Sequence, residues 1–118
     1  MYSPQLLDHF QNPRHAGELN DAPLRVRQEN PVCGDILELT ATTNNGTLAE
    51  IRFRAKGCVP AMACASAICE LAHGKSLSIV RGIKKEDVLN AVGGVPPASD
   101  HAAQLALDAL QALLRKSL

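Results

Sequence analysis

Three junctions in the sequence carry residue types that bind metal ions or sulfur. Cys33 and Asp35 flank a glycine, Cys58 follows a glycine and begins an apolar segment, and His101 opens the last helical segment. Thiolate sulfur and imidazole nitrogen are ligands that borderline and soft transition ions prefer, and a carboxylate adds a hard oxygen. If Cys33 and Asp35 point into one pocket, they can bind an ion together.

The expected helix starts give Cys58 and His101 particular chemistry. A thiol at a helix N-terminus lies near free backbone N–H groups and the positive end of the helix dipole, which favour the thiolate. We therefore expect Cys58 to ionise readily. The same field disfavours an imidazolium, so we expect His101 to be neutral and able to coordinate.

The other cysteines have a plainer interpretation, since a free cysteine is usually a small buried hydrophobe. This is the expected role of Cys69, which points away from Cys64 on the same helix. Cys64 follows Cys58 by roughly one and two-thirds helical turns, so it either belongs to the core or faces the same pocket.

The remaining histidines are expected at the surface or as helix caps: His9, His15 and His73. No two cysteines stand in the Cys-x-x-Cys spacing that is typical of structural zinc sites. The spacing of the cysteines alone therefore does not decide whether the protein has a metal site.

The hydrophobic pattern predicts which elements position these residues. Ser3 and Pro4 suit the start of a short helix that Asn12-Pro13 ends. Alternating residues indicate three strands, and an Asn-Asn-Gly hairpin turn joins the second to the third. Helices follow, the first of them apolar nearly all round. The expected helices after the strands are 60–73, 76–81, 84–92 and one that Ser99 caps. The order α-βββ-αααα predicts an α+β fold, a three-stranded antiparallel sheet packed against several helices.

Composition narrows the class of protein. A length of 118 residues with 46% apolar residues suits a single domain, 1–118, with one core. The net charge of zero argues against a nucleic-acid partner, and no apolar run is long enough to span a membrane. Without a recognisable signal peptide, we expect a cytoplasmic protein in which four cysteines stay free thiols or ligands.

Several motifs in this order resemble one family over nearly the whole chain. It is the family of U-type iron–sulfur cluster assembly scaffolds, the IscU-like proteins that also form the N-terminal domain of NifU. The motifs are Asp8-His9-Phe10-Gln11-Asn12-Pro13-Arg14, Cys33-Gly34-Asp35, Gly57-Cys58 with the following helix, Gly74-Lys75-Ser76-Leu77, and Pro96-Pro97 ahead of His101.

The resemblance implies a function and a ligand set. In this family a cysteine desulfurase supplies persulfide sulfur, iron joins it, and a transient [2Fe–2S] cluster passes to recipient proteins. Zinc often occupies the resting site. The ligands implied here are Cys33, Asp35, Cys58 and His101. We expect a binding protein without turnover chemistry, as a monomer or a weak dimer.

Two departures from the family stand out. A third cysteine normally follows the histidine, whereas Ala102 does so here, and Cys64 is the available substitute as a cluster ligand. The segment that binds a dedicated Hsp70-type chaperone normally ends in valine and lysine, but here in Ala98 and Ser99. These replacements argue against specific recognition by that chaperone.

Three hypotheses follow from the sequence. The first is an iron–sulfur cluster scaffold or carrier. The second is a divergent zinc-binding paralogue that docks on a cysteine desulfurase as a regulator or sulfur acceptor. The third, a thiol enzyme using Cys58 and Cys64, is the weakest because no Cys-x-x-Cys motif exists and no general base is evident.

Overall fold

The computed structural model describes residues 2–117, and its centre is an antiparallel sheet. Strands β1 (Leu24–Asn30), β2 (Asp35–Asn44) and β3 (Thr47–Lys56) lie in the order β1-β2-β3. Asn45 and Gly46 join β2 to β3 with φ values of 53° and 79°. Two consecutive positive φ values are characteristic of a type I′ hairpin turn, so the predicted Asn-Gly turn is confirmed.

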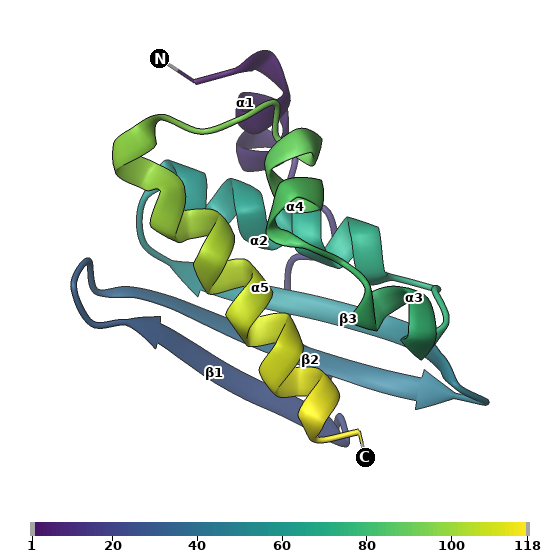
Figure 1. Ribbon diagram of the computed structural model, residues 1–118. Helices are drawn as coiled ribbons and strands as arrows, with labels where there is room; N and C mark the ends of the chain where they lie inside the picture. Colours follow the sequence, from purple (N-terminus) through teal and green to yellow (C-terminus); the bar gives the residue numbers. More distant parts are fainter. Residues whose placement is uncertain (1, 118) are drawn as a thin grey trace.

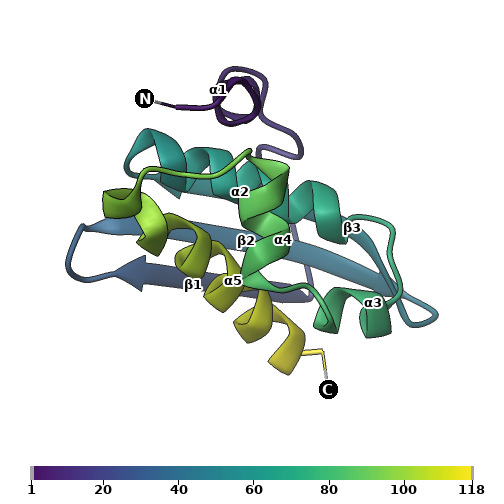
Figure 2. The same cartoon turned by 45° about the horizontal axis from the view of Figure 1, so that its top comes forward.

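The helices follow the predicted order and gather on one face of the sheet (Figure 1). α2 packs against β3, α5 crosses β1 and β2, and α1 lies beyond α2, farther from the sheet (Figure 2). Their bounds are α1 Pro4–Gln11, α2 Val59–Ala72, α3 Leu77–Arg81, α4 Lys85–Ala91 and α5 Asp100–Arg115, with a 3-10 turn at Pro97–Ser99. The α+β fold predicted from the sequence is confirmed.

The core lies between the sheet and the helices. Leu37, Leu39 and Ala41 on β2 alternate with more polar residues and are at most 2% exposed. Ile51 and Phe53 do the same on β3, at 0% and 4%. Each side chain of this size contributes about 1.5–3 kcal/mol when it is fully buried, so the period-2 pattern fixes which face of the sheet the helices cover.

Ser3 stabilises the N-terminal helix α1 by a local hydrogen bond and by a bond to a distant part of the chain. The Ser3 hydroxyl accepts a hydrogen bond from the Leu6 N–H at 3.0 Å, which confirms the predicted cap of α1. The same hydroxyl donates to the carbonyl of Val92 at the end of α4. Ser3 therefore caps one helix and links it to the end of another.

The segment after α1 runs along the edge of β3. The Phe53 N–H donates to the carbonyl of His15 at 2.9 Å, and the Gly17 N–H donates to the carbonyl of Phe53 at 2.8 Å. These two bonds on either side of Ala16 form a short parallel bridge. The loop between α1 and β1 thus has a fixed position against the sheet.

The C-terminal end of α2 is hydrogen-bonded to the start of β3, next to the β2–β3 turn. The Gly74 N–H donates to the carbonyl of Leu48, and the Leu48 N–H donates to the carbonyl of Lys75, both at 2.8 Å. Gly74 has φ +74°, the left-handed conformation expected of a glycine just beyond a helix. The predicted helix end is confirmed.

The start of α5 differs from the prediction for Ser99. Its side chain makes no capping hydrogen bond, and its φ of −109° and ψ of 11° lie outside the extended conformation of a capping serine. The 3-10 turn Pro97–Ser99 instead leads directly into the helix. Among residues 2–117, no helix is long and apolar enough to cross a membrane.

Candidate metal centre

Asp35 and Cys58 meet where β2 begins and α2 begins. Cys58 is the N-cap residue of α2, as predicted, and its backbone N–H donates to Asp35 Oδ1 at 3.2 Å. The Cys58 Sγ lies 3.4 Å from Asp35 Oδ2. Asp35 is only 3% exposed. Its backbone belongs to β2, and its carboxylate accepts the hydrogen bond from the start of α2, so both elements fix its position.

His101 completes a compact group from a third element, the first turn of α5. Its Nε2 lies 3.3 Å from Asp35 Oδ2 and 4.0 Å from Cys58 Sγ. The three ligand atoms lie within 4.8 Å of one another. Ligands around a tetrahedral zinc ion are about 3.3–3.8 Å apart, given bond lengths of about 2.0–2.3 Å. The spacing therefore suits one shared ion.

Cys33 lies in the same hollow but outside this group of three. It belongs to the turn 31–34 between β1 and β2, and its side chain is exposed. Gly34 allows this turn through its φ of +75°, with its N–H donating to the carbonyl of Asn30 at 2.7 Å. The hollow measures about 580 Å³ and is lined by Cys33, Gly34, Asp35, Lys56, Gly57, Cys58, Ser99 and His101.

Gly57 is required by the close approach of Asp35. A Cβ at this position would lie 2.7 Å from Asp35 Cγ and 3.0 Å from its Cβ. Any other residue would force the carboxylate away from Cys58. The Gly-Cys pair therefore has a steric reason as well as a chemical one.

The ionisation of Cys58 differs from the prediction. Burial raises the pKa of the Cys58 thiol, and the Asp35 carboxylate raises it further through its hydrogen bond and its charge. The backbone N–H groups at the helix start, above all that of Ala61, lower this pKa, as expected, but burial outweighs them. The expected thiolate is thus wrong for the metal-free protein, and a bound cation would reverse the balance.

Cys64 does not reach the hollow. It is 0% exposed, and burial raises the pKa of its thiol to about 12. Cys69 is also 0% exposed, so its predicted place in the core is confirmed. Of the two positions predicted for Cys64, the structure has the core position. Ala102, where the resemblance implies a cysteine, is 1% exposed on α5.

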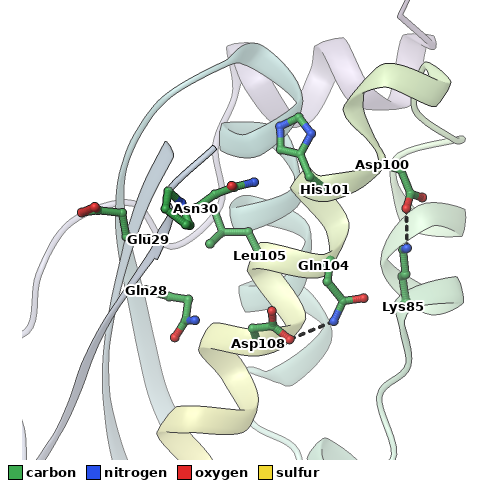
Figure 3. A pocket seen from close by; sticks show the side chains of 10 residues that line it. Gln28, Glu29, Asn30, Lys85, Asp100, His101, Gln104, Leu105 and Asp108 are labelled. Carbon is green, nitrogen blue, oxygen red and sulfur yellow. Dashed lines mark hydrogen bonds and ion pairs between the residues drawn. The ribbon is translucent and has the colours of Figure 1, made fainter. Parts of the chain in front are cut away.

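His101 also borders a second hollow on its other side. This hollow, about 530 Å³, is lined by Gln28, Glu29, Asn30, Pro31, Lys85, Asp100, His101, Gln104, Leu105 and Asp108. In Figure 3 the His101 ring points away from Asp108, while Lys85 pairs with Asp100. The imidazole therefore separates a polar hollow along β1 and α5 from the hollow that contains Cys58.

A polar network between α1 and α2 was not predicted from the sequence. His9, expected at the surface, is 5% exposed, and its Nδ1 lies 2.9 Å from the Ser66 hydroxyl on α2. The same hydroxyl accepts a hydrogen bond from the Arg14 backbone N–H at 2.8 Å. The surface prediction for His9 is wrong because α1 packs its histidine face onto α2. A serine within the otherwise apolar stretch 59–69 is the one sequence signal that could have indicated this partner.

The comparisons with known proteins agree with this architecture. Residues 1–116 match the family model of the NifU-like N-terminal domain. The chain belongs to this family. The iron–sulfur cluster assembly scaffold protein IscU 1 of Archaeoglobus fulgidus is 38% identical over 111 residues, which cover 94% of this chain and 72% of that protein.

A further relative supports the same assignment, and a solved structure has the same fold. The iron–sulfur cluster assembly scaffold protein IscU of Escherichia coli K12 is 33% identical over 117 residues, 96% of this chain and 91% of that protein. The N-terminal part of a nitrogen-fixing NifU-like protein from Brucella abortus has a TM-score of 0.79 at 16% identity, covering 97% of this chain and 92% of that chain. The last likeness concerns the fold alone.

Proposed function

We propose that this NifU-like domain is a scaffold on which a [2Fe–2S] cluster is assembled and from which it passes to recipient proteins. The observation that carries the proposal is the convergence of Asp35, Cys58 and His101, with ligand atoms within 4.8 Å of one another. The cluster is the cargo of the protein. The relatives carry the name of iron–sulfur cluster assembly scaffold proteins. A cysteine desulfurase would supply the sulfur, as the resemblance to this family implies.

The ligand set suits a cargo that must leave. Cys58 offers a soft sulfur, and Cys33, on an exposed turn of the same hollow, offers a second one. Asp35 and His101 provide oxygen and nitrogen in place of further thiolates. A cluster held by fewer sulfurs is expected to be more labile, which is what a donor requires.

Four residues have defined roles in this proposal. Cys58, Asp35 and His101 hold the metal, with Asp35 also fixing Cys58 through the backbone N–H. Cys33 reaches the metal from its turn. The chain performs no catalytic turnover, because these groups bind the cargo rather than transform a substrate.

Anaerobic reconstitution with ferrous iron, cysteine, a cysteine desulfurase and a thiol reductant, which converts the persulfide sulfur to sulfide, tests the proposal. We expect visible absorption of a cluster with equal amounts of bound iron and sulfide, and loss of both in Cys58→Ala. Cys69→Ala is the matched control, because Cys69 is a buried cysteine of the same helix and should keep the cluster. A colourless protein with one zinc ion per chain would contradict the proposal.

One alternative is a zinc-binding paralogue that docks on a cysteine desulfurase as a regulator or sulfur acceptor, and the geometry supports its zinc-binding part. Three ligand atoms at tetrahedral spacing suit Zn²⁺, and position 102 is alanine. If a cluster forms, Cys64→Ala tests whether Cys64 takes the place of the missing third cysteine. An unchanged cluster yield would show that Cys64 does not replace the missing cysteine, as its burial predicts.

A further inference from the structure

The two edges of the sheet differ in how far the chain itself covers them. At the outer edge of β3, the backbone of Phe53 bonds to the segment 15–17, and that of Leu48 bonds to the segment 74–75. At the other edge, residues 24–29 of β1 make backbone hydrogen bonds to β2 alone, as far as the described part of the chain shows. An edge strand of this kind offers its outward N–H and C=O groups to a partner strand.

The outward backbone groups of β1 belong to its odd-numbered residues. In an antiparallel pair, alternate residues direct both backbone groups to the neighbouring strand, and the residues between them direct theirs away. The carbonyl of Asn30 accepts a hydrogen bond from the turn towards β2 at 2.7 Å, so the even-numbered residues face β2. The Lys116 ammonium donates to the carbonyl of Arg25 at 2.7 Å, in agreement with an outward carbonyl. The N–H and C=O groups of Arg27 and Glu29 remain for a partner.

The side chains along this edge carry opposite charges. Arg27 and Glu29 are exposed, and Arg27 Nη2 lies 3.3 Å from Glu29 Oε2. By the alternation of the strand, Gln28 between them belongs to the helix-covered face, where it lines the hollow of about 530 Å³ between β1 and α5 (Figure 3). A strand with a glutamate opposite Arg27 and an arginine opposite Glu29 would fit this edge. β1 itself has this order of charges when it runs in the opposite direction.

We propose that β1 pairs with β1 of a second copy of this chain, antiparallel and around a two-fold axis at Gln28. Such an interface is isologous, because the same surface patch serves on both copies. The register sets Arg27 of each copy opposite Glu29 of the other, and each of these pairs can exchange two backbone hydrogen bonds. Opposite charges directly across two strands stabilise the pairing, whereas like charges weaken it.

The neighbouring registers fit the edge less well. A register centred on Arg27 or on Glu29 sets two like charges opposite each other. The register centred on Arg27 also requires the carbonyl of Arg25, to which Lys116 already donates. In the proposed register Arg25 comes opposite Pro31, which has no N–H to donate, so the bond from Lys116 can persist. The backbone groups and the charges therefore select the same register.

A dimer of this kind keeps the two candidate metal centres apart. The paired strands run in opposite directions, so the turns 31–34 that follow them, with Cys33, lie at opposite ends of the interface. Neither copy contributes a ligand to the centre of the other, and the inference does not depend on the proposed cluster scaffold. A few backbone hydrogen bonds along one short strand bury little surface, so the association should be weak and should depend on protein concentration.

Sedimentation equilibrium of the metal-free chain tests the proposal. A thiol reductant is present, so that the exposed Cys33 cannot form a disulfide-linked dimer. We expect a monomer–dimer equilibrium at protein concentrations up to about 1 mM. Arg27→Glu and Glu29→Arg each set like charges opposite one another twice and should weaken association at least about tenfold. The double variant Arg27→Glu/Glu29→Arg exchanges the two charges and should restore association.

Arg81→Glu is the matched control, because it changes the net charge by the same amount at an exposed residue of α3. It should leave association unchanged. Circular dichroism of each variant checks that its secondary structure is intact. A parent chain that stays monomeric up to about 1 mM would overturn the proposal, and so would a double variant that associates as weakly as its single variants.

Hydrogen exchange of the parent chain locates the interface without any substitution. The amide protons of Arg27 and Glu29 should exchange more slowly as the protein concentration rises, because pairing gives them acceptors. Those of Val26 and Gln28, which face β2, should exchange slowly at every concentration. Association without added protection of Arg27 and Glu29 would place the interface elsewhere and refute the proposal.

Discussion

Replacing Gly57 by alanine tests the geometry of the candidate metal centre without touching a ligand. The new Cβ would lie 2.7 Å from Asp35 Cγ, whereas carbon atoms in contact are normally about 3.5–4.0 Å apart. The carboxylate must therefore move by about 1 Å, several times the ±0.2 Å that a metal–ligand bond tolerates. The φ of Gly57 lies outside the left-handed region, so the substitution adds a methyl group without backbone strain.

The expected result of Gly57→Ala is a loss of metal affinity by at least about tenfold. Its displaced carboxylate also loses the hydrogen bond from the Cys58 N–H, so we expect a stability loss of about 1–3 kcal/mol. Zinc competition with a coloured chelator measures the affinity, and urea unfolding measures the stability.

Gly82→Ala is the matched control, because a Cβ there meets ordinary contact distances, the nearest being 3.4 Å to the Ile79 carbonyl. It should leave the zinc affinity unchanged. If Gly57→Ala also binds zinc as tightly as the parent chain, Asp35 is not a ligand and the geometric argument fails.

Three further predictions concern the N-terminal helix and the helix starts. Ser66→Ala removes the hydroxyl that bonds to His9 and should lower the free energy of unfolding, measured in urea, by about 1–3 kcal/mol. A loss below about 0.5 kcal/mol would argue against the network. Burial lowers the pKa of His9 in the folded protein, so at falling pH the unfolded chain takes up the proton first, and the free energy of unfolding should decrease below about pH 6.5. His9→Gln should flatten this pH dependence. An unchanged slope would refute the role of His9. Ser3→Ala should cost about 1 kcal/mol, whereas Ser99→Ala should cost a few tenths at most, and equal losses would contradict the assigned caps.

The sheet and the main helices could be predicted because their signals are local. Alternation on β2 and β3, together with Asn45-Gly46, specifies a hairpin with one buried face. An apolar segment such as α2 has no polar face, so it must lie inside. Ser99 shows the limit of a local signal, because a serine before a helix caps it only if its backbone is extended.

The candidate site was predictable in its residue types and less so in its chemistry. Each of Asp35, Cys58 and His101 lies at a junction of elements, and the fold brings these junctions together. The thiol pKa of Cys58 depends on burial and on a carboxylate 23 residues away in the chain, which no local pattern contains. The imidazole rings of His15 and His73 stack on each other, and this contact depends in the same way on the loop that follows α1.

Cluster transfer tests the central claim most directly. The reconstituted chain is mixed anaerobically with a metal-free [2Fe–2S] ferredoxin in the presence of an iron chelator, and the circular dichroism of the ferredoxin cluster is followed over time. We predict that the ferredoxin signal grows as the scaffold signal declines, and that Cys58→Ala gives no transfer. A scaffold signal that is lost only to the chelator, with no ferredoxin cluster formed, would contradict the account.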